Sequence, residues 1–301
     1  MKLFIKYFLI ISAALALDSC SSGCEPDAPE VADNVTVTLN VGLDRDASRS
    51  DSPDVDRLLV CAVYDSSGNH LPELGTDNSG QIVIDLAASP AQLSLKLVKG
   101  QVYNILLWAM NSEYADAYDT ADLRSVQMID PSKLPVTGGN ADAFFKTETF
   151  TAVADGIRAI KLRRAVATVN LLTTASELDY VRSFADTDEA TVTFSAKVPV
   201  KFDLFTGEVS EFVDRTFAPS RFDPVFRNVD LGDDGTAPDG DYAVLAEVSI
   251  FAPGQSTLMS GAMFSVNDLK INLPGFFYQR NYNTNILITD FSQYAENPAH
   301  N

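Results

Sequence analysis

The sequence predicts an all-β protein of two antiparallel β-sandwich domains with few short helices. Apolar and polar residues alternate with a period of two in one run after another, which is typical of strands that bury one face. Gly, Pro, Asp and Asn separate these runs at spacings typical of antiparallel sandwiches. Helical signals are short and lie at 112–128 and 175–185. A length of 301 residues favours two domains over one.

The first residues predict export. Lys2 and Lys6 precede an apolar run at 7–17, which has the length of a signal peptide and is short for a membrane span. The run ends Leu17-Asp18-Ser19-Cys20, which resembles a bacterial lipobox. We therefore expect residues 1–19 to be a lipoprotein signal peptide.

Cys20 is the predicted lipidation site, because a cysteine directly after such a run becomes the acylated first residue of the mature chain. Cys24 is a competing site, and a small disulfide between Cys20 and Cys24 is a further alternative. The residues that follow are rich in proline and acidic side chains, so 20–34 is predicted to be a disordered tether.

An N-terminal β-sandwich is predicted over 35–162. In its first strand Val35, Val37, Leu39 and Val41 alternate with polar residues. Further strand patterns follow at 57–65, 80–87, 91–111 and 156–173.

A C-terminal β-sandwich is predicted over 163–294, followed by a polar tail at 295–301. The boundary at 162/163 gives halves of similar size, and it comes just before a new run in which apolar and polar residues alternate. Pro199 fits an edge strand or a bulge, and Thr206-Gly207 fits a turn. The main strand patterns lie at 189–210, 241–253, 259–275 and 280–292.

The charge balance argues against nucleic acid as a partner. The chain has 22 basic and 41 acidic residues, a net charge of −19, and binding to phosphates needs clustered Lys and Arg. The acidic excess is typical of a soluble, self-repelling exposed surface.

Enzyme signals are weak throughout the sequence. His70 and His300 are the two histidines of the sequence, so a serine triad or a histidine-ligated metal site would have at most two imidazoles to draw on. Cys61 lies in a strand pattern and is expected to be a small buried hydrophobe. We predict no catalytic residue, no cofactor and no metal site, and classify the protein as a non-enzyme.

Two features have both a structural and a functional interpretation. The acidic segment 229–242 is a solvated turn or, less favoured, a calcium loop without the usual ligand spacing. Trp108 with Phe144, Phe145 and Phe150 forms core packing or, less favoured, a platform for carbohydrate. The acidic residues concerned are Asp230, Asp233, Asp234, Asp239 and Asp241.

Motifs along nearly the whole mature chain resemble the fimbrillin-like proteins of Bacteroidales, the subunits and anchors of type V pili and their surface lipoprotein relatives. Each motif is soft, so the strength of the resemblance lies in their order. Besides the lipobox, they are "YNILLWAMN" (103–111), "DAFFKTETF" (142–150), "IKLRRAVATVNLLT" (160–173), "VPVKFDLFTGEV" (198–209) and "RNYNTNILITDF" (280–291).

The resemblance implies two transthyretin-like β-sandwich domains and a structural or adhesive role at the outer membrane or cell surface. In pilus-forming members a trypsin-like protease cuts after a basic residue in the loop behind the first strand. The strand is lost, and a neighbouring subunit adds a strand in its place. Here Arg45 and Arg49 are the candidate cleavage sites, whereas Arg57 begins the next strand and is less accessible.

The resemblance also implies the partners: the membrane through an N-terminal lipid anchor, other pilus subunits by β-strand addition, and a host or bacterial glycan or protein ligand. The last ten residues, "SQYAENPAHN", lack the alternation of a donor strand. An anchor, terminal or accessory subunit therefore fits better than a stalk subunit. The main alternative is a glycan-binding surface lipoprotein that serves nutrient uptake, and a lipid-anchored hydrolase is third.

Overall fold

Strands make up most of the described chain, so the all-β prediction is confirmed. The computed structural model describes residues 33–44, 55–86, 90–130, 133–134, 141–184, 189–217, 222–229, 231 and 240–293. Asn34–Asn301 form one compact unit, distinct from Met1–Asp33. The predicted division of this unit into domains at 35–162 and 163–294 stays a prediction. None of the helices in the described ranges is long and apolar enough to span a membrane.

The N-terminal sandwich is a single hydrogen-bonded sheet folded over on itself. In the part described, β8 and β9 pair at Phe144↔Arg164 and Phe145↔Arg163 alone, so the sheet turns a corner there. Side chains from both resulting layers share one core, which includes Leu39, Leu59 and Leu107. The strand order is β3 (Ile82–Asp85), β2 (Arg57–Asp65), β5 (Val102–Asn111), β8 (Ala143–Thr151), β9 (Gly156–Arg164), β1 (Asn34–Leu43) and β4 (Ala91–Val98).

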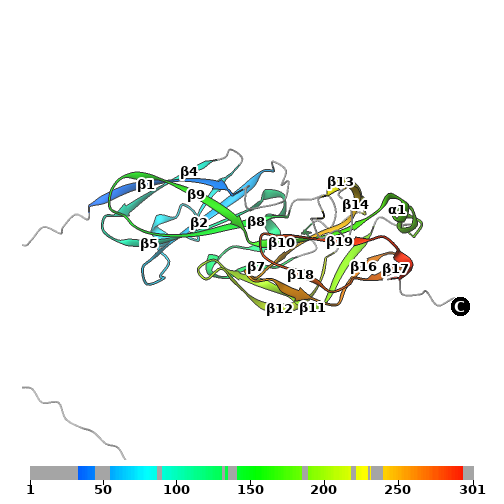
Figure 1. Cartoon of the computed structure of the whole chain (residues 1–301). Coiled ribbons are helices and arrows are strands. Elements are labelled where there is room, and N and C mark those ends of the chain that lie inside the picture. The colour runs from blue at the N-terminus through cyan, green and yellow to red at the C-terminus, as the bar shows by residue number, and fades with distance from the viewer. Residues whose placement is uncertain are drawn as a thin grey trace, which may run out of the picture. The chain divides into compact units, whose positions relative to one another are not determined.

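The C-terminal sandwich packs a sheet that contains β10 against one that contains β11 (Figure 1). The first has the order β13 (Val225–Val229), β14 (Gly240–Phe251), β10 (Val166–Thr173) and β19 (Asn283–Ile288). The second has the order β17 (Leu269–Asn272), β16 (Ala262–Val266), β11 (Ala190–Asp203), β7 (Val126–Met128) and β6 (Tyr118–Asp119), and β12 (Glu208–Phe217) also pairs with β11. A separate ribbon joins β15 (Thr257–Met259) to β18 (Phe276–Tyr278).

The helices are short, as the sequence predicts. The α-helix α1 covers Ala175–Arg182 within the predicted range 175–185, and the Thr174 side chain caps it by accepting a hydrogen bond from the Glu177 backbone N–H at 3.4 Å. The predicted helical turns at 112–128 are two of the 3₁₀ helices. Those described are η1 (Pro72–Leu74), η2 (Ser112–Ala117), η3 (Leu123–Ser125) and η5 (Phe291–Gln293).

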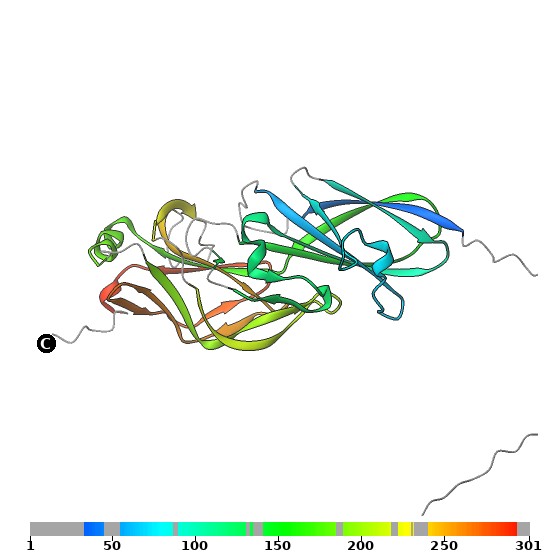
Figure 2. The same cartoon turned by 180° about the vertical axis from the view of Figure 1, so that it is seen from behind.

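The two sandwiches exchange elements. β6 and β7 come from the first half of the chain but extend the β11 sheet (Figure 2). Gln127 on β7 pairs there with Lys201 on β11. In return, the β11–β12 turn contacts the N-terminal sandwich, because the Thr147 hydroxyl donates to the Leu204 carbonyl and Phe205 packs edge-on against Tyr64 at 5.4 Å. The predicted turn at Thr206-Gly207 is confirmed, with a φ of 70° at Gly207.

This exchange buries both faces of β2 and β5. Cys61 and Leu107 face the core of the N-terminal sandwich, while Trp108 on the opposite face contacts Phe202 and Phe251 at ring distances of 6.1 and 6.0 Å. A strand buried on both faces has no reason to alternate, which explains the continuous apolar runs "RLLVCAVY" and "NILLWAM".

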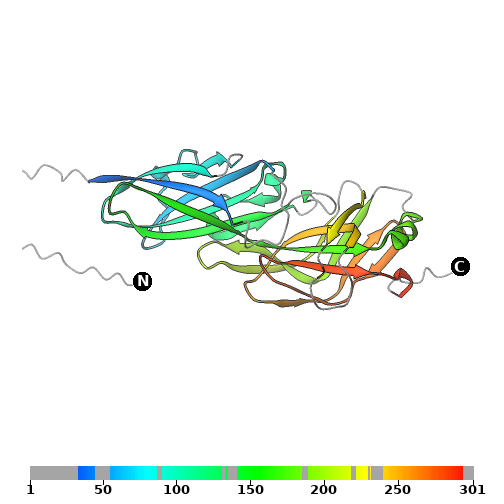
Figure 3. The ribbon, with the colours of Figure 1, turned by 45° about the horizontal axis from the view of Figure 1, so that its top comes forward.

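The first strands of the two sandwiches have the same surroundings. β1 lies between β4, which is antiparallel to it, and β9, which is parallel. β10 likewise lies between the antiparallel β14 and the parallel β19. In Figure 3 the red β19 runs beside the green β10. Each sandwich therefore begins with an inner strand whose parallel neighbour is the last strand of the same sandwich.

Candidate functional site

The slot that β1 occupies between β4 and β9 is the candidate site, because the strand exchange expected from the sequence would empty it. β1 pairs with β4 from Asn34↔Val98 to Val41↔Ala91, and with β9 from Val37↔Gly156 to Leu43↔Leu162. β4 is the end strand of the described sheet and is joined to it through β1. Removing β1 would therefore unpair one edge of β9 and detach β4 from the rest of the sheet.

The inner face of β1 fills an apolar slot. Val35, Val37, Leu39 and Val41 are 6%, 3%, 0% and 0% exposed, and all lie in the core of the N-terminal sandwich. Burying side chains of this size contributes about 1.5–3 kcal/mol each. The four together rival the roughly 5–15 kcal/mol that stabilises a typical domain. The vacated slot would strongly favour another strand with the same alternation.

Hydrogen bonds outside the strand ladders fix the position of β1 along the slot. The Thr36 N–H donates to the Asp155 carboxylate at 2.6 Å near one end, and the Asp44 N–H donates to the Leu162 carbonyl at 2.8 Å at the other. Since a slip by one residue would turn the apolar side chains outward, these bonds and the buried face specify one register.

The candidate cleavage sites lie in the sequence between β1 and β2. Arg45 and Arg49 fall outside the described residues, as do the predicted signal peptide at 1–19, Cys20, nearly all of the predicted tether at 20–34 and the predicted tail at 295–301. Arg57 begins β2 and is 4% exposed, with its guanidinium donating to the Val55 carbonyl at 3.2 Å and lying 5.4 Å from the centre of the Phe144 ring. A protease cannot reach a buried arginine on a paired strand, so the expectation for Arg57 agrees with the structure.

The C-terminal end is tied to the second sandwich. Phe291 is fully buried and stacks on Tyr180 at 6.2 Å, and its backbone N–H donates to the Glu177 carboxylate at 3.2 Å. Phe291 therefore packs against α1 and holds the last described residues to it.

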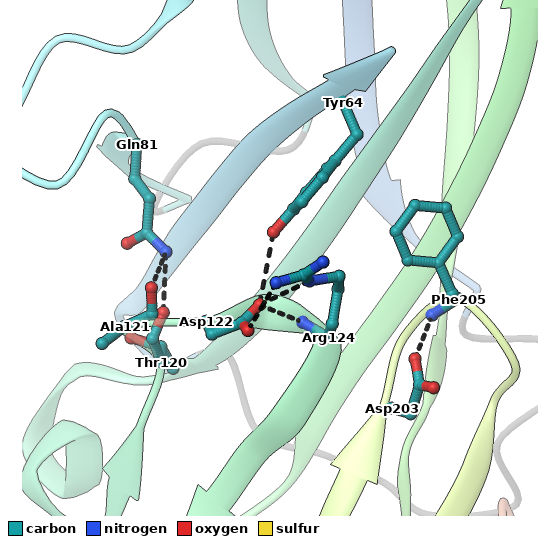
Figure 4. Close-up of polar contacts among 8 residues, drawn as sticks. All are labelled: Tyr64, Gln81, Thr120, Ala121, Asp122, Arg124, Asp203 and Phe205. Carbon is teal, nitrogen blue, oxygen red and sulfur yellow. Dashed lines mark hydrogen bonds and ion pairs between the residues drawn. The ribbon is translucent and has the colours of Figure 1, made fainter. Parts of the chain in front are cut away.

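A polar cluster joins β2 to η3, as Figure 4 shows. The Tyr64 hydroxyl donates to the Asp122 carboxylate at 3.4 Å, and the Arg124 guanidinium donates to the same carboxylate at 3.2 and 3.1 Å. Nearby, the Gln81 amide donates to the Thr120 carbonyl at 2.7 Å.

The charges and pKa shifts of this cluster indicate a structural role, in which it links β2 to η3. Burial, and then the negative charge of Asp122, raises the pKa of Tyr64 to about 12. Burial alone would raise the pKa of Asp122, but hydrogen bonds from Arg124 lower it below its usual range. A carboxylate that holds its charge and a phenol that holds its proton do not exchange protons near neutral pH, so this cluster does not suit general acid–base chemistry.

The other sequence candidates are structural. Trp108, Phe144, Phe145 and Phe150 are between 0% and 6% exposed, so they pack the core and offer no face to carbohydrate. Cys61 is buried, and burial raises its pKa to about 12. The expectation of a small buried hydrophobe is confirmed.

Within the described ranges, the remaining aromatic side chains do not form such a platform. Exposed aromatic residues occur on different elements, and they are Tyr180 on α1, Phe212 on β12, Phe226 on β13, Phe277 on β18 and Tyr282 before β19. A glycan-binding row on one sheet would need several of them on neighbouring strands.

The calcium hypothesis rests almost entirely on residues outside the described ranges. This applies to Asp230, Asp233, Asp234 and Asp239, while Asp241 accepts a hydrogen bond from the Asn228 amide at 3.2 Å. Among described residues, no group of three His, Cys, Asp or Glu side chains is placed to hold a metal. His70 lies against the Tyr64 ring at 5.1 Å and hydrogen-bonds the Gly80 carbonyl, and His300 is outside the described residues.

One buried ion pair has no counterpart in the sequence-based predictions. Arg164 on β9 donates to the Asp142 carboxylate, the Thr168 hydroxyl and the Asn283 amide oxygen, and its side chain is 1% exposed. Arg163-Arg164 looks like the solvated end of a strand, so only the alternation of β9 could have placed Arg164 on the inner face.

Comparison with known proteins places the chain in a family and beside several known folds. The model of a family of unknown function (DUF6562) matches residues 28–287. No curated protein matches the chain. Three similar solved structures share 11% sequence identity with it.

These three structures come from Bacteroidales. A proposed adhesin of Bacteroides ovatus has a TM-score of 0.46, covering 81% of this chain and 75% of that one. A proposed polysaccharide-binding protein (DUF1812) of Bacteroides thetaiotaomicron has a TM-score of 0.45, covering 86% and 93%. The fimbrial anchor protein Mfa2 of Porphyromonas gingivalis has a TM-score of 0.42, covering 80% and 82%.

Proposed function

This chain belongs to DUF6562, a family of unknown function, and we propose that it is a lipid-anchored cell-surface protein with a structural or adhesive role, a fimbrillin-like anchor, terminal or accessory pilus component. The slot that β1 occupies carries the proposal. It is an apolar slot in which β4 pairs with Asn34–Val41 and β9 pairs with Val37–Leu43. Without β1 it would present unpaired backbone and an apolar surface to a partner strand with apolar residues at alternate positions.

Given the order of features along the chain, the fate of β1 is the difference between an anchor and a processed subunit. Cys20, the proposed lipid site, comes before β1, and Arg45 and Arg49 come after it. A cut at either arginine would leave the lipid attached to β1 and free the rest of the chain once β1 departs. Retention at the membrane therefore requires that β1 stay in its slot.

The residues around and after Phe291 bear on the same proposal. The chain is latched at Phe291, and the ten residues after it lack strand alternation. A segment of this composition does not supply the apolar side chains that the β1 slot holds. We therefore propose that residues 292–301 do not serve as a donor strand.

Intact-mass spectrometry of the protein purified from its native cell envelope tests the proposal, together with a gel that compares heated and unheated samples. An acylated chain that starts at Cys20 and runs as a monomer supports the anchor. A product that starts at Asp46 or Ser50 and forms heat-sensitive ladders would instead identify a processed subunit joined by strand exchange.

Matched variants locate both sites. Cys20→Ser should abolish acylation and release the protein from membranes, whereas Cys24→Ser should leave both unchanged; the opposite pattern would move the lipid to Cys24. If a cleaved product exists, Arg45→Ala with Arg49→Ala should remove it. An unmodified, soluble wild-type chain would contradict the anchor.

A further inference from the structure

We propose that the fold is built to resist tension applied between its two ends, because the first and last strands of each sandwich are parallel neighbours. This goes beyond the proposed function, since it concerns how force passes through the chain and requires no particular partner. Tension enters the compact unit at Asn34, passes through the β9–β10 junction, and leaves after β19.

In the N-terminal sandwich the geometry places the β1–β9 pair in shear. Val37 lies beside Gly156 and Leu43 beside Leu162, with the two strands parallel. Tension pulls β1 toward its N-terminal end and β9 toward its C-terminal end, which are opposite directions along one shared ladder. The bonds of this ladder are therefore loaded together.

The C-terminal sandwich repeats the arrangement with different residues. Thr168 lies beside Asn283 and Thr173 beside Ile288, again in parallel. Tension enters β10 at its N-terminal end and leaves β19 at its C-terminal end, so this pair is also sheared. The two clamps lie in series along the chain.

Shear differs from peeling in how many hydrogen bonds must fail at once. When force acts on adjacent strand ends, the pairs open one after another, so each step breaks only a small part of the ladder. When force acts along the ladder, all the pairs must yield before the strands can slide. The barrier to unfolding is then higher, and forced unfolding is governed by the unfolding rate.

Side chains reinforce the β10–β19 pair. The Thr173 hydroxyl donates to the Ile288 carbonyl at 2.8 Å, and the Asn170 amide donates to the Asn285 side chain at 2.9 Å. These bonds cross the same interface as the backbone ladder, so sliding must break them too.

The junction between the two clamps is fixed by a buried cluster. Arg164 ends β9, and its guanidinium is bonded to Asp142 before β8, to Thr168 on β10 and to Asn283 on β19. Tension that leaves β9 therefore meets a junction at which hydrogen bonds and an ion pair hold β9, β10 and β19 together.

Single-molecule pulling in two geometries tests this inference. In the full chain carrying Cys20→Ser, Cys24 supplies one attachment point, and a cysteine added after Asn301 supplies the other. Cys61 does not compete for the label, because burial raises its pKa to about 12. We expect rupture of the compact unit at a force several-fold above that of the control below.

The control moves only the second attachment point, to Lys99→Cys in the exposed turn after β4. Asn34 pairs with Val98, so force between the N-terminal segment and Lys99→Cys pulls adjacent strand ends and peels β1 away. Both proteins have the same β1 and the same attachment chemistry. Equal rupture forces at one loading rate, or a lower force in the end-to-end geometry, would overturn the inference.

Discussion

Leu39→Ala tests how firmly the first strand is seated. Leu39 is fully buried on the inner face of β1, within the core of the N-terminal sandwich. Truncation removes its apolar surface and leaves a cavity, at a cost of about 2–5 kcal/mol. For a unit of this size, each kcal/mol lowers the melting temperature by roughly 2–4 °C. We therefore expect the melting temperature, measured by circular dichroism, to fall by about 4–20 °C.

Thr38→Ala is the matched control, one position away on the outer face. It loses one hydrogen bond between the Thr38 and Ser94 hydroxyls, of length 3.0 Å, and should cost less than about 1.5 kcal/mol. Equal effects of the two variants would refute the seating of β1 with Leu39 inward. A loss below about 1 kcal/mol for Leu39→Ala would mean that β1 does not occupy its slot in solution.

Three further predictions concern buried polar groups. Arg164→Leu should lower the free energy of unfolding by about 3–5 kcal/mol, because the Asp142 carboxylate loses its guanidinium; adding Asp142→Leu should recover much of this in denaturant titrations, and no recovery would contradict the pairing. Burial, opposed by Arg227, raises the pKa of Glu247 above 4.5, so the folded state binds the proton more tightly than the unfolded state does. The stabilisation from this tighter proton binding is fully present below the pKa of Glu247 in the unfolded chain and is lost as pH rises through its pKa in the folded chain. Over this range the wild type should therefore lose stability relative to Glu247→Gln. Parallel stability profiles of the two proteins against pH would contradict this prediction. Cys61, with its pKa raised to about 12, should resist iodoacetamide at about pH 8 until denaturant unfolds the chain, and rapid native labelling would show that the thiol is accessible.

The sequence predicts the strands of this protein better than their partners. The alternation of Val35, Val37 and Leu39 indicates both the strand and its buried face. It does not reveal that β9 and β4 flank β1, because strand pairing over long separations depends on the whole fold. The candidate site is therefore half predictable: its occupant follows from the sequence, and its walls come from the structure.

Other elements carry too little local signal to be predicted. β6 and β7 are short, at Tyr118–Asp119 and Val126–Met128, so no period can be measured in either. Their place in the β11 sheet is a tertiary effect. Arg164 is similar, since nothing in a pair of consecutive arginines indicates that one of them is buried against an aspartate.

The exchange of β6 and β7 constrains when the protein can fold during its synthesis. Gln127 emerges long before Lys201, the residue with which it pairs, and the outer faces of β2 and β5 wait for Phe202 and Phe251. The first half of the chain thus cannot bury these outer faces until the second half has been synthesised. The core of the N-terminal sandwich uses residues of the first half alone, so the contacts across β2 and β5 form late in folding.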